Sequence, residues 1–389
     1  MNDTQQGIIT LMKSALLQQP LELPADFAME AAYDHAKRHH ISTMLYDGAV
    51  RCGVSRKLPV MQQLFRTYCK ATQVSERQGQ ALNRLYAAFE EADIDYMPLK
   101  GCNMKALYPS PELRLMGDAD ILIRLEQYDR IAPVMESLGF EAGDISDHEI
   151  VWKSDALYLE LHKRLIPSQN RDYHGYFKDG WQFAKKREGR RWSMTAEDEW
   201  IYLFTHFAKH YRDGGIGCRH VADLWLFREK HPELAEDYIR SVLEQLTLLE
   251  FYDNICRLLA VWFSDAAGDE KLEFMTEYIF ASGSWGDIDS RVLSRTVRDS
   301  QKSALGRNGR LVYLWKLAFP SVQVLQGKYT VLKRMPWLLP LVWLIRPFYK
   351  FLFERKSLQR QKQEMAALSQ ENLEERRRVL RYVGLDYRF

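Results

Sequence analysis

The sequence lacks the cysteine pattern that a disulfide framework or a structural zinc site would need. Its five cysteines are widely spaced, and no two of them form a Cys-x-x-Cys pair. Such usage is typical of proteins in a reducing cytoplasm. The sequence also lacks a secretory signal pattern and any apolar run of the roughly 18 residues that a membrane span requires. We therefore expect a cytoplasmic protein, with peripheral association with the cytoplasmic face of a membrane as the alternative.

No charge of one sign dominates the chain. Its 54 lysines and arginines face 52 aspartates and glutamates, and the net charge is +2. A dedicated nucleic-acid-binding protein is usually more basic or carries a basic stripe, so no nucleic-acid partner is expected. Internal repeats and low-complexity segments are absent too, and 46% of the 389 residues are hydrophobic. That content is enough for cores in two or three domains.

The spacing of apolar residues predicts a small sheet between two helical parts. Apolar positions recur every three or four residues from residue 1 to about residue 91, which indicates helices. From residue 93 to 165, turns separate short apolar runs, which predicts about four strands, at 96–99, 119–123, 151–153 and 157–161. From Thr195 to about Trp262 the pattern is helical again, and Thr195 with Asp198 fits a capping signature.

We therefore predict an α+β fold in which a small mixed sheet is flanked by helical N-terminal and C-terminal domains. A looser stretch is expected from Gly283 to Asn308. The predicted parts are a helical N-terminal domain, an α/β core, a helical domain and a basic, aromatic tail with a C-terminal helix, at residues 1–91, 92–190, 191–327 and 328–389.

Two aspartates one residue apart, Asp118 and Asp120, are the central chemical feature. Side chains alternate between the faces of a strand, so both carboxylates point to the same side. Their mutual repulsion is costly unless a cation lies between them, and Mg²⁺ is bound by one or two carboxylates plus substrate phosphates. Two such ions can hold the attacking and leaving oxygens in phosphoryl or nucleotidyl transfer. The alternative is a solvated acidic pair, and in either case removing one carboxylate should not lower the stability.

A candidate phosphate site precedes the aspartates. Lys100 and Gly101 follow a predicted strand directly and precede a predicted short helix at 103–108. Such a turn can present backbone N–H groups to a phosphate, and the Lys100 ammonium would add a positive charge. Arg114 could bind another phosphate oxygen. The alternatives are an ordinary surface lysine and a plain turn glycine.

A third carboxylate is expected on a neighbouring strand. In the alternating run from Leu157 to His162, Glu160 and His162 lie on the face of the strand opposite the leucines. Glu160 is the natural third metal ligand or general base, and His162 is either part of the site or a hydrogen-bonded structural histidine.

Three further pairs have more than one interpretation. Asp93 and Asp95 repeat the Asp-x-Asp pattern but lie where turn chemistry favours aspartate. His206 and His210, four residues apart on a predicted helix, could bind a metal, face a substrate or be structural. Arg219 and Asp223 are expected to form an ion pair along a helix, with contact between Arg219 and an anionic substrate as the alternative.

These motifs together resemble the uncharacterised nucleotidyltransferase family of the DNA-polymerase-beta-like superfamily. The resemblance is strongest over residues 80–165 and extends more loosely to the segments around His206 and Arg219. The residues that carry it are Leu99-Lys100-Gly101, Leu107-Tyr108-Pro109, Arg114, Asp118-Ala119-Asp120-Ile121-Leu122 and Leu159-Glu160-Leu161-His162.

The resemblance implies a minimal nucleotidyltransferase fold, dependence on Mg²⁺ (or Mn²⁺) and an NTP such as ATP as substrate. Transfer of a nucleoside monophosphate to a hydroxyl or phosphate acceptor would follow, in surface polysaccharide or peptide modification. Asp118, Asp120 and Glu160 would then be metal-binding and catalytic residues, and Lys100, Gly101 and Arg114 would hold the triphosphate. Cys102 and Glu160 depart from the small residue and the aspartate that are more usual. The alternatives are phosphoryl transfer and a non-catalytic nucleotide-binding or assembly factor.

The tail combines positive charge with aromatic residues. Between Lys328 and Lys362 there are nine lysines or arginines and seven aromatics but one acid, Glu354. Its apolar centre, from Met335 to Ile345, is too short to span a bilayer. Basic flanks and tryptophans suit a segment that lies on an anionic membrane. The alternative is a helix pair packed on the protein's own core.

Overall fold

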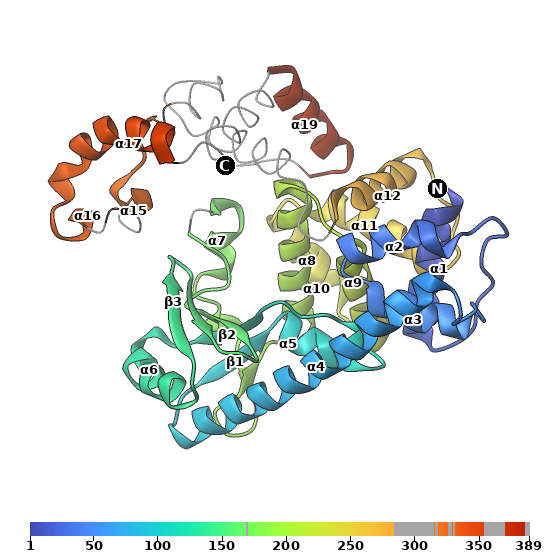
Figure 1. Ribbon diagram of the computed structural model, residues 1–389, viewed down its shortest axis with the longest axis horizontal. Helices are drawn as coiled ribbons and strands as arrows, with labels where there is room; N and C mark the ends of the chain where they lie inside the picture. Colours follow the sequence, from blue (N-terminus) through green and yellow to red (C-terminus); the bar gives the residue numbers. More distant parts are fainter. Residues whose placement is uncertain are drawn as a thin grey trace. The chain divides into compact units, whose positions relative to one another are not determined.

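The computed structural model describes residues 1–168, 170–283, 315, 318–325, 329, 331–353 and 370–385 (Figure 1). The chain divides into two compact units. Residues 1–210 and 216–285 form the first, and residues 211–215 and 286–389 form the second. The looser stretch predicted from Gly283 to Asn308 lies outside the described residues beyond Gly283 itself.

The first unit opens with four helices. Asn2 begins the first of them with a reciprocal capping box to Gln5, and Pro59 takes the first position of the last, where a missing N–H costs nothing. Their formation confirms the helices predicted before residue 92. They are α1 (Asp3–Leu17), α2 (Met29–Arg38), α3 (Ser42–Arg51) and α4 (Pro59–Glu91).

A five-stranded mixed sheet follows, as the α+β prediction requires. Its strands are ordered β1-β2-β5-β4-β3, and every neighbouring pair is antiparallel except the central pair of β2 and β5, which is parallel. The strands are β1 (Tyr96–Leu99), β2 (Ala119–Ile123), β3 (Glu141–Ile145), β4 (Glu149–Lys153) and β5 (Tyr158–His162).

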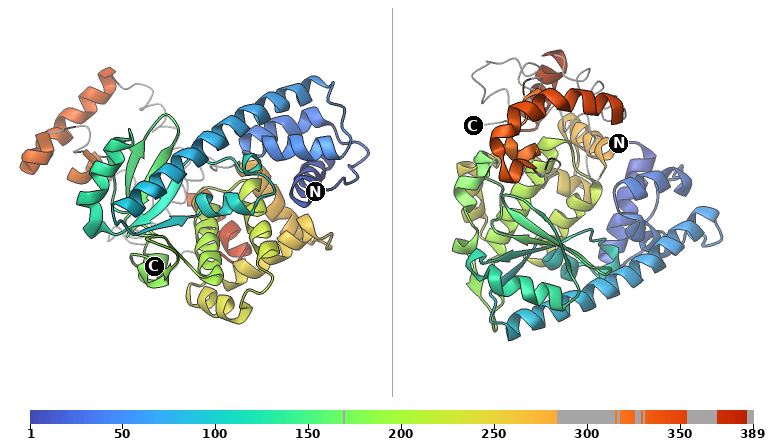
Figure 2. Two further views of the ribbon diagram at one scale, coloured as in Figure 1. Left: turned by 90° about the horizontal axis from the view of Figure 1, so that it is seen from below. Right: turned by 60° about the vertical axis from the view of Figure 1, so that its left-hand side comes forward.

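The two faces of this sheet have opposite character because side chains alternate along each strand. Ile121 of β2 and Leu159 of β5 belong to one buried apolar cluster with Leu85 of α4 and Met135 of α6 (Tyr128–Ser137). Figure 2 shows the long helix α4 running from the N-terminal helices to the sheet. Because helices cover one face of the sheet, the polar residues of the central strands lie on the other face.

The edge strand β3 is absent from the predicted set of about four strands. Its residues are mostly exposed, Gly143 lies in its middle, and its register with β4 shifts between Ala142 and Ile145. Such a strand has no buried alternating pattern, so pairing with β4 and not local sequence defines it.

Short elements lie between the strands of the sheet and between the sheet and the helices that follow it. The Thr195 hydroxyl accepts the Asp198 N–H at 3.2 Å, which confirms the predicted capping signature. The short elements are α5 (Gly101–Met104), η1 (Lys105–Leu107), η2 (Pro111–Leu113), η3 (Leu125–Gln127), α7 (Arg171–Phe177), η4 (Trp181–Phe183), β6 (Lys185–Lys186) and β7 (Trp192–Ser193). The helices are α8 (Ala196–Asp213), α9 (Cys218–Lys230), α10 (Glu236–Gln245), α11 (Leu249–Phe263) and α12 (Glu270–Ser282).

The described part of the second unit is helical. None of the helices in the described ranges combines the length and apolarity that crossing a bilayer requires. The elements are α15 (Val322–Leu325), α16 (Val331–Arg334), η5 (Pro336–Leu338), α17 (Leu339–Phe353) and α19 (Gln370–Tyr382).

A buried histidine joins three helices of the first unit. His39, fully buried at the end of α2, accepts the Cys218 N–H of α9 on Nδ1 at 3.3 Å. Its Nε2 lies 3.2 Å from the carbonyl oxygen of Phe280 in α12 and therefore carries the proton. Burial lowers the pKa of His39 from 6.5 to about 4, although the Phe280 carbonyl favours the charged form.

We expect His39 to make the fold sensitive to acid. The pKa of His39 is lower in the folded state than in the unfolded state. The contribution of His39 to the free energy of unfolding is therefore complete above pH 6.5 and is lost as the pH falls toward 4. The loss can reach about 3 kcal/mol. Urea unfolding between pH 7.5 and 4.5 should show a steeper decline for the wild type than for His39→Gln, which cannot titrate. Equal slopes for the two proteins would contradict this assignment.

Candidate active site

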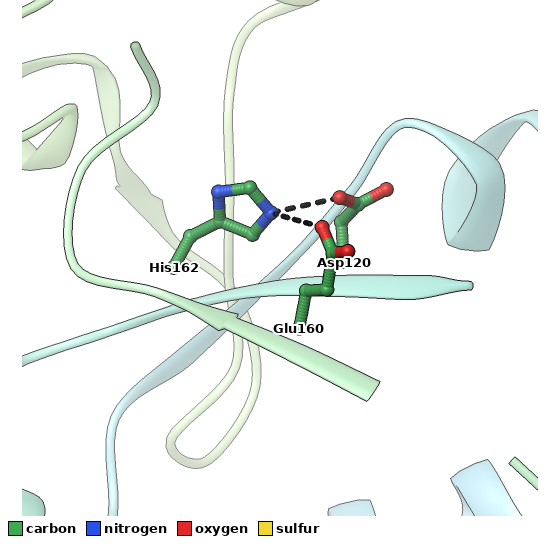
Figure 3. A group of neighbouring side chains, drawn as sticks. All are labelled: Asp120, Glu160 and His162. Carbon is green, nitrogen blue, oxygen red and sulfur yellow. Dashed lines mark hydrogen bonds and ion pairs between the residues drawn. The ribbon is translucent and has the colours of Figure 1, made fainter. Parts of the chain in front are cut away.

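The central strands bring two acids and a histidine together at one face of the sheet. In the parallel pairing of β2 with β5, Asp120 lies beside Glu160 and Leu122 beside His162. Figure 3 shows the carboxylates of Asp120 and Glu160 directed to the same imidazole nitrogen. His162 Nε2 lies 2.7 Å from Asp120 Oδ1 and 3.6 Å from Glu160 Oε2.

Asp120 is held as a buried anion. Its Oδ1 accepts hydrogen bonds from Lys100 Nζ at 3.0 Å and from His162 Nε2 at 2.7 Å, and the residue is only 4% exposed. Burial alone would raise the pKa of Asp120, but Lys100 and His162 outweigh it and hold the pKa far below its usual range. Burial and Lys100 likewise oppose a charge on His162, yet its carboxylate partners leave the pKa of that imidazole raised.

Asp118 stands directly before β2 and is only partly buried. Burial raises the pKa of Asp118, and the charges of Asp120 and Glu160 raise it further. The predicted repulsion among these acids is therefore present, and it is concentrated on Asp118 because Lys100 and His162 neutralise Asp120.

The site fits a divalent cation. Ligand atoms of Asp120, Glu160 and His162 all lie within 4.8 Å of one another. Asp120 Oδ2 accepts no hydrogen bond from any described residue, so one of its oxygens is available to an ion. Asp118 lies outside this group of three, so its role as a ligand stays a prediction, and His162 is a ligand candidate beyond the predicted set.

The turn after β1 positions Lys100. Lys100 has a φ of +41°, which side chains rarely adopt and which functional sites often retain. A Cβ added to Gly101 would lie 3.1 Å from Arg114 Nη1, so glycine allows that arginine to pass close to the backbone. The helix after the turn, α5, has only four residues, which leaves Lys100 as the main feature of this turn that can bind phosphate.

The thiol of Cys102 is no nucleophile in this setting. Burial raises the pKa of Cys102 to about 12, and the nearby charge of Asp120 adds to the effect. A neutral thiol here behaves as a small side chain, which fits the position that it takes in the resemblance.

Arg114 has a structural partner that the sequence pattern did not indicate. Its Nε and Nη2 donate to the two oxygens of Asp223 at 2.8 and 2.9 Å, and the Tyr108 hydroxyl donates to the same carboxylate at 2.8 Å. The predicted ion pair between Arg219 and Asp223 is therefore wrong, because in the described part of the chain Asp223 pairs with Arg114. Arg114 still lines the cavity described next, and its Nη1 donates no hydrogen bond to any described residue.

One cavity contains every predicted site residue. Lys100 and Arg114 line it beside the acids, and α8 and α9 supply a second, basic part of its lining. The predicted members are Lys100, Gly101, Arg114, Asp118, Asp120 and Glu160, and the additional polar ones are His148, Glu149, His162, His206, Lys209, His210, Arg219, His220 and Asp223.

Two of the additional residues escaped prediction for a simple reason. β4 begins at Glu149, two residues before the predicted strand. The predicted strand therefore does not include Glu149, which the alternation along β4 places beside His162. His148 donates to Glu149 at 2.8 Å. Extending the predicted hairpin by two pairs of residues places Glu149 beside His162, with His148 directly before the strand.

The second Asp-x-Asp pair has a structural role. Asp93 pairs with Arg190, and Asp95 accepts from Arg124 Nε at 3.0 Å. Neither aspartate lines the cavity, which agrees with the turn interpretation.

A small mixed sheet with acids on adjoining central strands, a lysine turn and a flanking helical wall defines a nucleotidyltransferase-type fold. The chain belongs to the family described as uncharacterised nucleotidyltransferase, whose model matches residues 25–264. No curated protein matches the chain.

Among solved structures, the chain is similar to the antibiotic-resistance factor ANT(2'')-Ia, known from a solution structure. The identity is 15%, the match covers 44% of this chain and 91% of that one, and the TM-score is 0.32. So loose a likeness has no bearing on the activity of this protein.

Proposed function

We propose that this protein transfers a nucleoside monophosphate from an Mg-NTP to a hydroxyl or phosphate acceptor. The observation that carries the proposal is the set of carboxylates on one face of the central strands. Asp118, Asp120 and Glu160 face a cavity that Lys100 also lines. A buried set of like charges is costly without a cation, and phosphate-bound Mg²⁺ supplies one.

Each side chain has a distinct role in this proposal. Asp118, Asp120 and Glu160 would hold Mg²⁺ or Mn²⁺, which neutralises the charge on the phosphates when it is bound. Lys100, which donates to Asp120 here, would donate to a phosphate oxygen of the NTP instead. His162 positions the Asp120 carboxylate through Oδ1.

The reaction would form a bond between the acceptor oxygen and the α-phosphorus of the NTP. The bond from the α-phosphorus to the bridging oxygen breaks, and pyrophosphate leaves. The proton of an acceptor hydroxyl would pass to Glu160, which is half-buried beside Asp120.

Label transfer tests the reaction type. The wild-type protein is incubated with Mg²⁺, cell metabolites and an NTP labelled at either the α- or the γ-phosphorus. Nucleotidyl transfer places the α-label in the product and releases the γ-label in pyrophosphate. Transfer of the γ-label would instead show phosphoryl transfer. NTP binding without any product would favour the non-catalytic nucleotide-binding factor.

We also propose that the tail contacts an anionic membrane from the cytoplasmic side. Its described part has apolar side chains exposed to solvent, with Trp337 69% and Leu344 71% exposed. No acid occurs between Val331 and Phe353, and Lys333, Arg334, Arg346 and Lys350 lie in the same stretch. Positive charge beside exposed apolar groups suits an anionic lipid surface. The predicted segment before residue 329 and after residue 353 lies outside the described residues.

We expect the full-length protein to co-sediment with vesicles that contain phosphatidylserine, and less so at high salt. The double variant Trp337→Ser, Leu344→Ser should bind at least about tenfold more weakly, because two exposed apolar groups contribute about 1.5–3 kcal/mol each when buried. Ile145→Ser, at a 69% exposed position on β3, is the matched control and should bind like the wild type. Equal binding by all three proteins would exclude this contact.

A further inference from the structure

We infer that the part of the cavity formed by α8 and α9 is a phosphate-binding site that is distinct from the carboxylates. It comprises His206, Lys209 and His210 of α8 with Arg219 and His220 of α9, here called the basic wall. The claim that this phosphate is part of a substrate rests on the proposed function. The claim that the basic wall binds phosphate is independent of that function, because its evidence comes from these side chains alone.

Arg219 is a buried cation that forms no ion pair with a carboxylate of the described residues. It is 9% exposed and lines the cavity, and its Nη1 donates to the Leu115 carbonyl at 2.8 Å. Its buried Nε has no hydrogen-bond partner among the described residues. Asp223, one helical turn further along α9, is bound through both oxygens to Arg114. The Asp223 carboxylate is thus already paired with another guanidinium, and a buried charge left without a partner is costly unless a ligand completes it.

The position of Arg219 in its helix points to the same ligand. α9 has 13 residues and begins at Cys218, with Gly217 as an N-cap that offers no side chain to the first turn. Arg219 and His220 therefore lie at the positive end of the helix dipole, where cations are disfavoured and anions are stabilised. A phosphate bound there would interact favourably with the helix end and with the guanidinium.

His220 presents a donor to this site. Arg219 Nη2 lies 3.2 Å from His220 Nε2, and because a guanidinium only donates, Nε2 accepts. The neutral imidazole then carries its proton on Nδ1, a buried atom with no hydrogen-bond partner among the described residues. His220 lines the cavity, and no described residue competes for this N–H with a phosphate oxygen bound there.

The two histidines of α8 form a pair that can take up one proton. His206 Nε2 and His210 Nε2 are 3.0 Å apart, so one nitrogen donates while the other accepts. Protonation of both would bring two N–H groups face to face. A single added proton would place a positive charge on the pair and next to a phosphate in the cavity.

Burial and the surrounding positive charges disfavour protonation of His206 and His220 in the absence of an anion. Burial lowers the pKa of His206 well below 6.5, and His210 and Lys100 lower it further. Burial also lowers the pKa of His220, with Arg219 as the next cause. The charged groups that act on these two imidazoles are Lys100, Arg114, Lys209, Arg219 and Asp223. Four of these five groups are cations. A bound phosphate offsets their positive charge and so favours proton uptake by the histidines.

Calorimetry with inorganic tripolyphosphate tests the basic wall without any metal. In EDTA, we expect the wild-type protein to bind tripolyphosphate and Asp118→Asn to bind it at least as tightly, because the substitution removes a negative charge from the same cavity. Lys209→Gln and Arg219→Gln should each bind about tenfold more weakly, since each loses a charged hydrogen bond. Lys230→Gln, which removes an exposed lysine at the other end of α9, is the matched control and should bind normally.

The proton balance gives an independent readout. Titrations at pH 7 in two buffers of different ionisation enthalpy should show uptake of protons by the wild type and less uptake by His220→Gln. Thermal unfolding of each variant shows whether it is folded, and Lys209→Gln serves if Arg219→Gln is not. No binding of tripolyphosphate in EDTA, or equal binding by the wild type and both variants, would overturn the inference.

Two sources of the phosphate can be separated with the same proteins. If the basic wall binds the triphosphate of the NTP, tripolyphosphate should compete with a non-hydrolysable Mg-NTP analogue. If it binds a phosphate of the acceptor, inorganic phosphate should still bind when that analogue is present. Either result supports the wall as a phosphate site. A tripolyphosphate-binding protein that shows no label transfer would refute the proposed function alone.

Discussion

Asp118→Asn and Asp120→Asn should each lower nucleotidyl transfer by about 10²–10⁴-fold, the range for loss of one catalytic group. Both side chains line the cavity, and Asp120 shares its strand register with Glu160. Under the proposed function, removing either carboxylate would weaken the binding of a divalent ion at the point where charge develops. The measurement is the rate of α-label transfer at saturating Mg²⁺ and NTP. More than about a tenth of the wild-type rate in either variant would contradict the site assignment.

The two variants should differ in stability. This difference distinguishes the specific loss of a carboxylate from a general defect in folding. The repulsion that raises the pKa of Asp118 disappears in Asp118→Asn, so its free energy of unfolding should equal or exceed that of the wild type. Asp120→Asn leaves Lys100 and His162 without their anionic partner in a buried site, so it should be destabilised. The sequence alone predicts no loss for either change, whereas the contacts of Asp120 predict a loss for Asp120→Asn. Urea unfolding without metal measures both, and the opposite order would refute this division of charge.

Arg114→Met should lower the free energy of unfolding by about 3–5 kcal/mol, because it leaves a buried carboxylate without its cation. Arg114 and Asp223 are 5% and 6% exposed and are joined by two hydrogen bonds. Urea unfolding at pH 7 measures the effect. The Arg114→Met, Asp223→Asn double variant should lose less than Arg114→Met alone, because the uncompensated charge is gone.

Arg240→Met provides the matched control for this prediction. Arg240 also pairs with an aspartate, Asp253, at 2.6 Å, but both side chains are at least 40% exposed. Exposed pairs contribute about 0–1 kcal/mol, so this variant should resemble the wild type. A loss below about 1 kcal/mol for Arg114→Met as well would show that the buried pair does not stabilise the fold, and would return Arg114 to the phosphate role alone.

The composition and periodicity of the chain were sufficient for the α+β class and for most of the elements of the first unit. Helices before residue 92, the strand at 119–123 and the cap at Thr195 follow from local spacing, which depends on few neighbours. The edge strand β3 could not be found this way, because an exposed strand with a central glycine has no buried face to mark it.

For the site, the sequence by itself determined which residues share a face. Alternation places Asp118 with Asp120 and Glu160 with His162, since a strand has a period of two residues. Only the tertiary structure decided which partners meet across elements: Asp223 with Arg114 and not with Arg219, and Lys100 with Asp120. Such pairings join residues up to 109 positions apart, so no local period can reveal them. The same reason applies to the basic wall, whose members come from two helices that only folding brings to one cavity.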